Sequence, residues 1–118
     1  MKRVLIIDDN PDFLHMAART LEKRGFAAVP VDCSGAARAA LAGGGIDAVL
    51  LDVVLGRENG WEVLRQLHES SPVPILLMSG GNVDEDMRID AAELGARGVI
   101  QKPFDWDGVV ETLSQVTR

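Results

Sequence analysis

The sequence predicts an α/β fold in which a doubly wound, five-stranded parallel sheet carries five helices on its two faces. Three observations lead to this prediction. The chain contains continuous apolar runs at residues 4–7, 48–51 and 75–78, which are typical of strands buried on both faces. Segments with helical periodicity alternate with these runs. The length of 118 residues and the 47% share of hydrophobic residues suit one folding unit with a substantial core.

The elements follow one another in strict alternation. Asn10 is the expected N-cap of the first helix, Pro11 takes its first position, and Gly25 ends it. Ser34 and Asp105 are the expected caps of the second and last helices. We expect strands at residues 3–7, 27–31, 47–51, 74–78 and 98–101, helices at residues 11–24, 34–42, 60–68, 85–94 and 105–116, and loops at residues 56–60 and 80–84.

Composition argues against several classes of function. The formal net charge of -6 argues against direct binding of nucleic acid, which needs clustered Lys and Arg. The sequence has no apolar stretch of membrane-spanning length and no signal-like segment, so we expect a cytoplasmic location and no membrane contact. Cys33 is the only cysteine, and we interpret it as a small apolar packing residue. Trp61 and Trp106 stand near helix starts, where packing against the sheet is the expected role.

Acidic residues stand where the predicted strands end. Asp8 and Asp9 follow the first strand, and Asp52 follows the third. Right-handed crossovers favour the strand order 2-1-3-4-5 of flavodoxin-like sheets, which makes the first and third strands neighbours about 4.8 Å apart. Their carboxylates can then share one divalent cation, and Mg²⁺ together with Lys102 would balance the three negative charges. Ser79, at the end of the fourth strand, adds a hydroxyl donor.

This ordered set of residues resembles the receiver domain of two-component response regulators, in particular chemotaxis-regulator-like receivers, over essentially the whole chain. The resemblance rests on Asp8-Asp9, Asp52, Gly60, Ser79, the segment 95–98 and Lys102-Pro103. Each motif is short, but together they appear in receiver-like order on the expected strands. The resemblance implies that residues 1–118 form a single receiver domain of a bacterial signalling protein.

The resemblance also implies a role for each matching residue. Asp52 is expected to accept a phosphoryl group from a phosphohistidine, while Lys102 and Ser79 help to neutralise the transferred oxygens. Ser79 is further expected to sense the phosphoryl group. Mg²⁺ or Mn²⁺ is the implied cofactor, and its expected protein ligands are Asp8, Asp9, Asp52 and the backbone carbonyl of Val54.

Protein partners follow from the same resemblance. The phosphoryl donor would be a sensor histidine kinase or a histidine phosphotransfer protein. An output domain or a target protein would contact the face formed by the fourth helix, the fifth strand and the fifth helix, where position alone selects Asp86, Arg88, Ala92 and Gln101. We expect the chain to catalyse only its own phosphotransfer and dephosphorylation, with no turnover of an independent substrate.

Two residues depart from the receiver pattern. Val99 stands three residues before Lys102, where the family carries an aromatic residue that moves together with the hydroxyl residue at Ser79. Gly56 stands where many receivers have proline, so we expect a conformationally freer loop over residues 56–60. The phosphorylation site is therefore expected to be intact, while the route from the site to a partner stays open.

Three other functions stay open on the sequence. A degenerate receiver that acts only as a phosphorylation-independent docking module would fit Val99 and Gly56. A metal-dependent phosphatase with an Asp nucleophile would need a second acid two residues later, whereas Asp8 is followed by Asp9 and Asn10. A flavin-binding protein would need a phosphate-binding loop rich in Ser, Thr and Gly after the first strand, and this segment does not have that composition.

Overall fold

The computed structural model describes residues 1–102 and 105–118, and Pro103 of the receiver-like motif lies outside the described residues. A five-stranded sheet runs in the order β2-β1-β3-β6-β7, and all of its neighbouring strands are parallel. Its strands are β1 (Arg3–Ile7), β2 (Ala27–Val31), β3 (Ala48–Asp52), β6 (Ile75–Ser79) and β7 (Ala96–Gln101). Since β6 and β7 are the fourth and fifth predicted strands, this arrangement confirms the predicted order 2-1-3-4-5.

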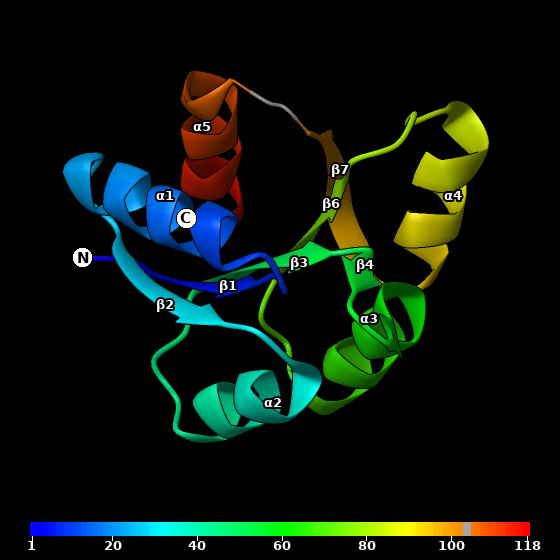
Figure 1. Ribbon diagram of the computed structural model, residues 1–118, viewed down its shortest axis with the longest axis horizontal. Coiled ribbons are helices and arrows are strands. Elements are labelled where there is room, and N and C mark those ends of the chain that lie inside the picture. Colours follow the sequence, from blue (N-terminus) through cyan, green and yellow to red (C-terminus); the bar gives the residue numbers. More distant parts are fainter. Residues whose placement is uncertain (103–104) are drawn as a thin grey trace.

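Helices cover both faces of the sheet. They are α1 (Pro11–Lys23), α2 (Ser34–Ala42), α3 (Gly60–Ser70), α4 (Glu85–Glu93) and α5 (Trp106–Val116). Figure 1 shows α1 and α5 side by side on one face, with α2, α3 and α4 on the other. Over residues 1–102 and 105–118, none of the helices combines the length and the apolar character needed to cross a bilayer.

Alternate residues of the central strands belong to two apolar clusters, one on each face of the sheet. Val4 and Ile6 of β1 pack in the cluster of α1 and α5, whereas Leu5 and Ile7 pack in the cluster on the other face. All residues of β3 and β6 are buried, as expected for strands covered on both sides. The burial continues to the last residue of each strand, so the polar groups at these strand ends are largely shielded from water.

The predicted start of the first helix and the predicted cap of the last one are confirmed. The side chain of Asn10 accepts hydrogen bonds from the backbone N–H groups of Asp12 and Phe13 at 3.0 and 3.2 Å. The side chain of Asp105 caps α5 in the same way. Gly25 follows α1 with a φ of 89°, a conformation that favours glycine. These caps fix the helices that border the carboxyl ends of the strands.

The start of α2 corrects two predictions. Cys33, not Ser34, is the N-cap, and the Cys33 side chain makes no capping hydrogen bond. Cys33 is also exposed rather than packed. The physical reason is a contact from a distant segment: the N–H and the hydroxyl of Ser34 both donate to the Glu58 carboxylate. These hydrogen bonds lower the pKa of Glu58, and the carboxylate satisfies a helix start that has no local cap.

The segment after β3 is more regular than the sequence predicts. Instead of an irregular loop at residues 56–60, β4 (Val54–Leu55) and β5 (Glu58–Asn59) form a short antiparallel hairpin. Gly56 lies at its turn with a φ of 59°, in the left-handed region. The Leu55 side chain is buried in the core, and Glu58 holds the start of α2. The hairpin next to Asp52 is therefore anchored at two points.

Replacing Gly60 by Ala is expected to lower the free energy of unfolding by about 1–3 kcal/mol, because overpacking at a fixed backbone contact is costly. The N–H of Gly60 donates to the Val53 carbonyl at 3.0 Å, and a Cβ at Gly60 would overlap that same backbone. Urea denaturation followed by circular dichroism measures the change.

Gly108→Ala is the matched control, because nothing in the described structure lies within 4 Å of a Cβ at Gly108 in α5. This substitution is expected to raise the free energy of unfolding by about 0.5–1 kcal/mol. A Gly60→Ala protein as stable as the wild type would contradict the close approach of Gly60 to Val53.

Candidate functional site

The sheet brings three aspartates together at the carboxyl ends of β1 and β3. Ile7 pairs with Leu51 in the parallel register, so Asp8 and Asp52 follow on adjacent strands. One carboxylate oxygen from each of Asp8, Asp9 and Asp52 lies within 4.8 Å of the others. Asp8 is fully buried, Asp52 is 8% exposed and Asp9 is exposed. The three sequence-predicted acids therefore form one cluster that opens to solvent on the Asp9 side.

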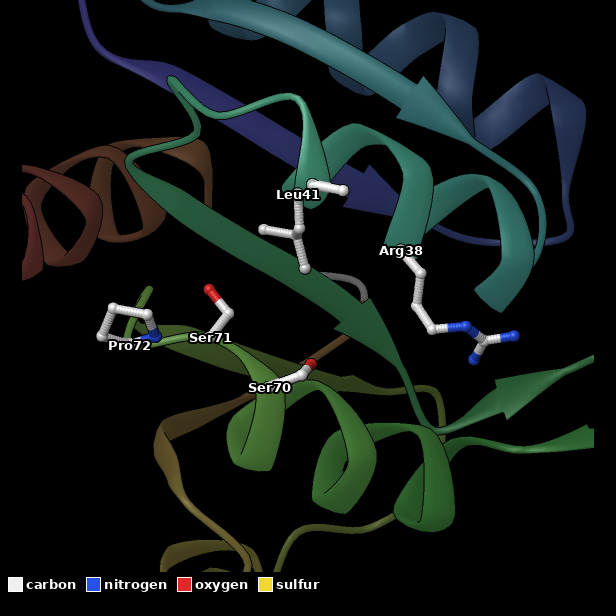
Figure 2. A pocket seen from close by; sticks show the side chains of 6 residues that line it. Arg38, Leu41, Ser70, Ser71 and Pro72 are labelled. Carbon is white, nitrogen blue, oxygen red and sulfur yellow. The ribbon is translucent and has the colours of Figure 1, made fainter.

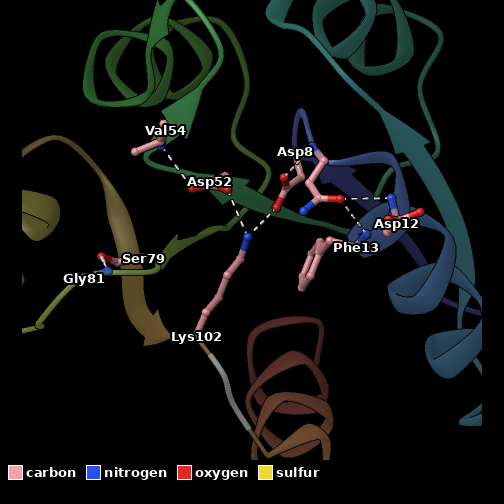
Figure 3. A network of polar contacts seen from close by, with 9 residues as sticks. Asp8, Asp12, Phe13, Asp52, Val54, Ser79, Gly81 and Lys102 are labelled. Atoms are coloured by element: carbon pink, nitrogen blue, oxygen red, sulfur yellow. Dashed lines mark hydrogen bonds and ion pairs between the residues drawn. The ribbon is translucent and has the colours of Figure 1, made fainter.

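Lys102 joins this cluster from the end of β7. Its ammonium Nζ lies 2.5 Å from Asp8 Oδ2 and 2.9 Å from Asp52 Oδ2. Figure 3 shows Lys102 reaching both carboxylates. The backbone N–H of Lys102 donates to the Ser79 carbonyl at 2.7 Å, which sets where the side chain leaves the sheet. One side chain thus bridges two carboxylates that are supplied by separate strands.

Backbone donors orient the two buried carboxylates. The N–H of Asn10 donates to Asp8 Oδ1 at 2.9 Å, and the N–H of Val54 donates to Asp52 Oδ1 at 3.0 Å. In each carboxylate one oxygen therefore faces the backbone while the other faces Lys102. This division fixes the orientation of both side chains, which is the preorganisation that an electrostatic site requires.

Among the described residues, Lys102 is the one cation in an ion pair with this cluster. The formal charges of three carboxylates and one ammonium sum to -2. Burial raises the pKa of Asp8 above 3.8, although its hydrogen bonds to Lys102 and Asn10 act in the opposite direction. Burial alone would lower the pKa of Lys102, but the hydrogen bonds to Asp8 and Asp52 outweigh it and raise the pKa above 10.5. A divalent cation has the charge and the oxygen preference that this cluster would accept.

The remaining predicted site residues lie near the cluster without bonding to it through their side chains. The Ser79 hydroxyl is buried and accepts a hydrogen bond from the Gly81 N–H at 3.2 Å. Figure 3 shows Ser79 set apart from the bonds among Asp8, Asp52 and Lys102. Val54 points its side chain outward, 64% exposed, while its backbone contacts Asp52.

Two aromatic residues complete the surroundings of Lys102, and the sequence analysis did not assign them to the site. The Lys102 Nζ lies 4.0 Å from the centroid of the Phe13 ring, in a cation–π arrangement. Phe13 in turn stacks on Trp106, with ring centroids 6.5 Å apart and an interplanar angle of 24°. The available signal was an aromatic residue in the first turn of a helix that starts directly after Asp9. The position of Trp106 near a helix start predicts packing against the sheet and gives no link to the site.

A cavity of about 340 Å³ lies elsewhere, beside the carboxyl-terminal parts of α2 and α3. Figure 2 shows its lining by Arg38, Leu41, Ser70, Ser71 and Pro72. In a parallel α/β sheet these helix ends lie at the edge opposite the carboxyl ends of the strands. The cavity is therefore separate from the aspartate cluster, and the chemistry concentrates at the cluster.

The surface positions selected from the sequence are accessible. Asp86, Arg88 and Ala92 on α4 and Gln101 on β7 are all exposed. Val99, on the same strand as Gln101, is buried in the cluster of α2, α3 and α4. The Val99 carbonyl accepts a hydrogen bond from the Arg88 guanidinium at 3.4 Å. A side chain from the exposed face of α4 thus bonds to the backbone of β7 at Val99.

Comparison with known proteins gives a consistent result. The VirG regulatory protein of Agrobacterium fabrum is 36% identical over 116 residues, which cover 98% of this chain and 45% of VirG. The chain thus spans less than half the length of that relative. Two solved structures also match over most of this chain. The BeF3-activated receiver domain of Klebsiella pneumoniae RstA has a TM-score of 0.90 and 25% identity, with 99% of both chains covered.

The second structure is a Burkholderia pseudomallei response regulator with a phosphorylated aspartic acid and a calcium ion. It has a TM-score of 0.85 and 26% identity, and the match covers 98% of this chain and 71% of that one. The family model of the response regulator receiver domain matches residues 4–114 of this chain. With its sheet order and its carboxylate cluster, this chain belongs to the receiver domain family of the response regulators of bacterial two-component systems.

Proposed function

We propose that this chain is a phosphoacceptor receiver in which Asp52 takes a phosphoryl group from a phosphohistidine. One observation carries the proposal: Asp8, Asp9 and Asp52 converge within 4.8 Å, and Lys102 bridges Asp8 and Asp52. An Asp52 oxygen would form the new P–O bond as the P–N bond to the donor histidine breaks, and the electron pair would return to the imidazole. Such transfer depends on positioning and charge neutralisation more than on a strong nucleophile.

The proposed cofactor is Mg²⁺ or Mn²⁺, held by Asp8, Asp9, Asp52 and the Val54 backbone carbonyl. When bound, the cation would neutralise charge on the transferred oxygens. Lys102 would shift from the carboxylates toward the phosphoryl group, because the added negative charge attracts the ammonium. The unbalanced charge of -2 around the three acids supports a divalent ion over a monovalent one.

Ser79 is the proposed sensor of the phosphoryl group. Its hydroxyl now accepts a hydrogen bond from the Gly81 N–H, and it would exchange that bond for one to a phosphoryl oxygen. Movement of residues 80–84 would then change the face of α4, β7 and α5, where a target protein or output domain is expected. The buried Val99 has no ring to rotate, so this loop would carry more of the change than an aromatic side chain would.

The wider setting is proposed from the relatives. One similar structure is a beryllofluoride-activated receiver and another contains a phosphorylated aspartic acid with calcium, which supports phosphorylation of an aspartate in this fold. We infer that residues 1–118 act as one receiver domain in the cytoplasm. A histidine kinase or histidine phosphotransfer protein would be the donor, and the chain would turn over no independent substrate. The unusual Val99 favours one other candidate, a docking module that works without phosphorylation.

Acetyl phosphate with Mg²⁺ is expected to add one phosphoryl group to Asp52, detected by intact-protein mass spectrometry and lost on treatment with hydroxylamine, as an acyl phosphate would be. Asp52→Asn should stay unmodified. Lys102→Met should react about 100-fold more slowly, because a charge-neutralising donor is removed from the reacting oxygens.

Asp12→Asn is the matched control, since Asp12 is an exposed aspartate in the first turn of α1 and outside the cluster. It should react like the wild type. An unmodified wild type would reject the phosphoacceptor function and leave the docking module as the remaining candidate.

Mg²⁺ affinity is expected to fall as the pH is lowered. The fall should begin at a pH above the usual pKa range of an aspartate. The raised pKa of Asp8 means that protons compete with the cation for this ligand at a higher pH than 3.8 would suggest. The loss should approach about tenfold per pH unit below that pKa. Amide chemical shifts of Asn10 and Val54, whose N–H groups bind the carboxylates, would measure the affinity.

In Asp8→Asn the affinity should be weaker and the pH profile flatter over the same range, because the titrating ligand is gone. An unchanged profile in Asp8→Asn would show that another group controls the pH dependence.

A further inference from the structure

We propose that Phe13 is a positioning residue for phosphoryl transfer, acting through Lys102. The Lys102 ammonium lies over the Phe13 ring, with 4.0 Å between Nζ and the ring centroid, and Figure 3 shows the ring beside the lysine head group. This inference rests on the proposed function of Asp52. It adds a residue that the resemblance to receivers did not single out.

The ring is itself held in place from two sides. On the backbone side, the Phe13 N–H donates to the Asn10 side chain at 3.2 Å, while the Asn10 N–H donates to Asp8 at 2.9 Å. On the ring side, Phe13 stacks on Trp106 at the start of α5. Asn10 thus bonds both to the backbone that carries the ring and to the carboxylate that the ammonium contacts.

A lysine side chain has several rotatable bonds, so holding its head group in one place costs conformational entropy. Hydrogen bonds to Asp8 and Asp52 hold Lys102 in the resting state, but those bonds must weaken when the ammonium turns to a phosphoryl oxygen. An aromatic face attracts a cation without offering a lone pair for a strong hydrogen bond. Phe13 can therefore support Lys102 both before and after the transfer, whereas an aliphatic side chain would supply only packing.

The position of Trp106 extends this contact to a second helix. Trp106 is the first residue of α5, and Asp105 caps that helix through the Asp107 N–H. Phe13 therefore contacts both Lys102 and the first residue of α5.

The test replaces Phe13 by phenylalanines with an increasing number of ring fluorines, which weaken the attraction for cations at nearly constant shape. Phosphorylation by acetyl phosphate with Mg²⁺ is expected to slow stepwise, reaching about fivefold for the fully fluorinated ring and for Phe13→Leu. Phe13→Tyr, which keeps an electron-rich face, should react within about twofold of the wild type.

Phe26 supplies the matched control, because it is buried in the same apolar cluster and is the same residue type. Fluorination at Phe26 should leave the rate unchanged. The Lys102 ε-methylene protons should also show an upfield ring-current shift by NMR in the unphosphorylated wild type, and Phe13→Leu should abolish it.

Equal rates for the wild type, Phe13→Leu and the fluorinated series would overturn the role of Phe13. The same conclusion would follow if fluorination at Phe26 slowed the reaction as much, or if the ring-current shift were absent. A wild type that takes no phosphoryl group would instead reject the proposed function of Asp52, and the positioning role would fall with it. The two failures are distinguishable because only the second affects the wild type.

Discussion

The bridge from the Lys102 ammonium to Asp8 and Asp52 is the interaction on which the site depends. Its three members come from the ends of β7, β1 and β3, so the bridge forms only when these strands take their places in the sheet. A buried carboxylate without a partner is costly, and removing one member of such a group leaves the others uncompensated. The fold therefore positions three charged groups that would not come together in an unfolded chain.

The same bridge leaves the aspartate cluster with more negative charge than one ammonium group balances. One ammonium is shared between two carboxylates, and Asp9 adds a third, exposed negative charge. The raised pKa of Asp8 means that the folded protein holds a proton there more tightly than the unfolded chain does. This proton stabilises the fold fully below the unfolded pKa of about 3.8, and its contribution is lost as the pH rises through the folded value. Near neutral pH a cation can take over that stabilising role.

The local pattern of the sequence was sufficient to predict the sheet and the acid cluster. Apolar runs identified the buried strands, and an acid directly after such a run identified the carboxyl end of the sheet, as at Asp52. Contacts between distant segments were not predictable in this way. The Glu58 carboxylate caps α2 in place of Ser34, and no spacing rule links these two residues. The stack of Phe13 on Trp106 likewise depends on α1 and α5 sharing one face of the sheet.

The contacts at β7 and at Lys102 lie on opposite faces of the sheet. Val99 packs on the face of α2, α3 and α4. Phe13 and Trp106 lie on the face of α1 and α5. Of these two, Phe13 is the one in direct contact with Lys102. Within residues 1–102 and 105–118, the aromatic pair at Lys102 is thus on the face opposite Val99. This arrangement connects Lys102 to α5 through the stacked rings of Phe13 and Trp106.

The central claim is that a divalent cation binds the aspartate cluster and balances its charge. The most direct test is urea unfolding in the presence of Mg²⁺ and in the presence of a chelator. In the wild type, Mg²⁺ at about ten times its dissociation constant should raise the free energy of unfolding by about 1.4 kcal/mol. Asp9→Asn should lose this response and be at least as stable as the wild type in chelator, while Asp12→Asn keeps the response. A wild type insensitive to Mg²⁺, or an Asp9→Asn protein that responds as fully as the wild type, would contradict the account.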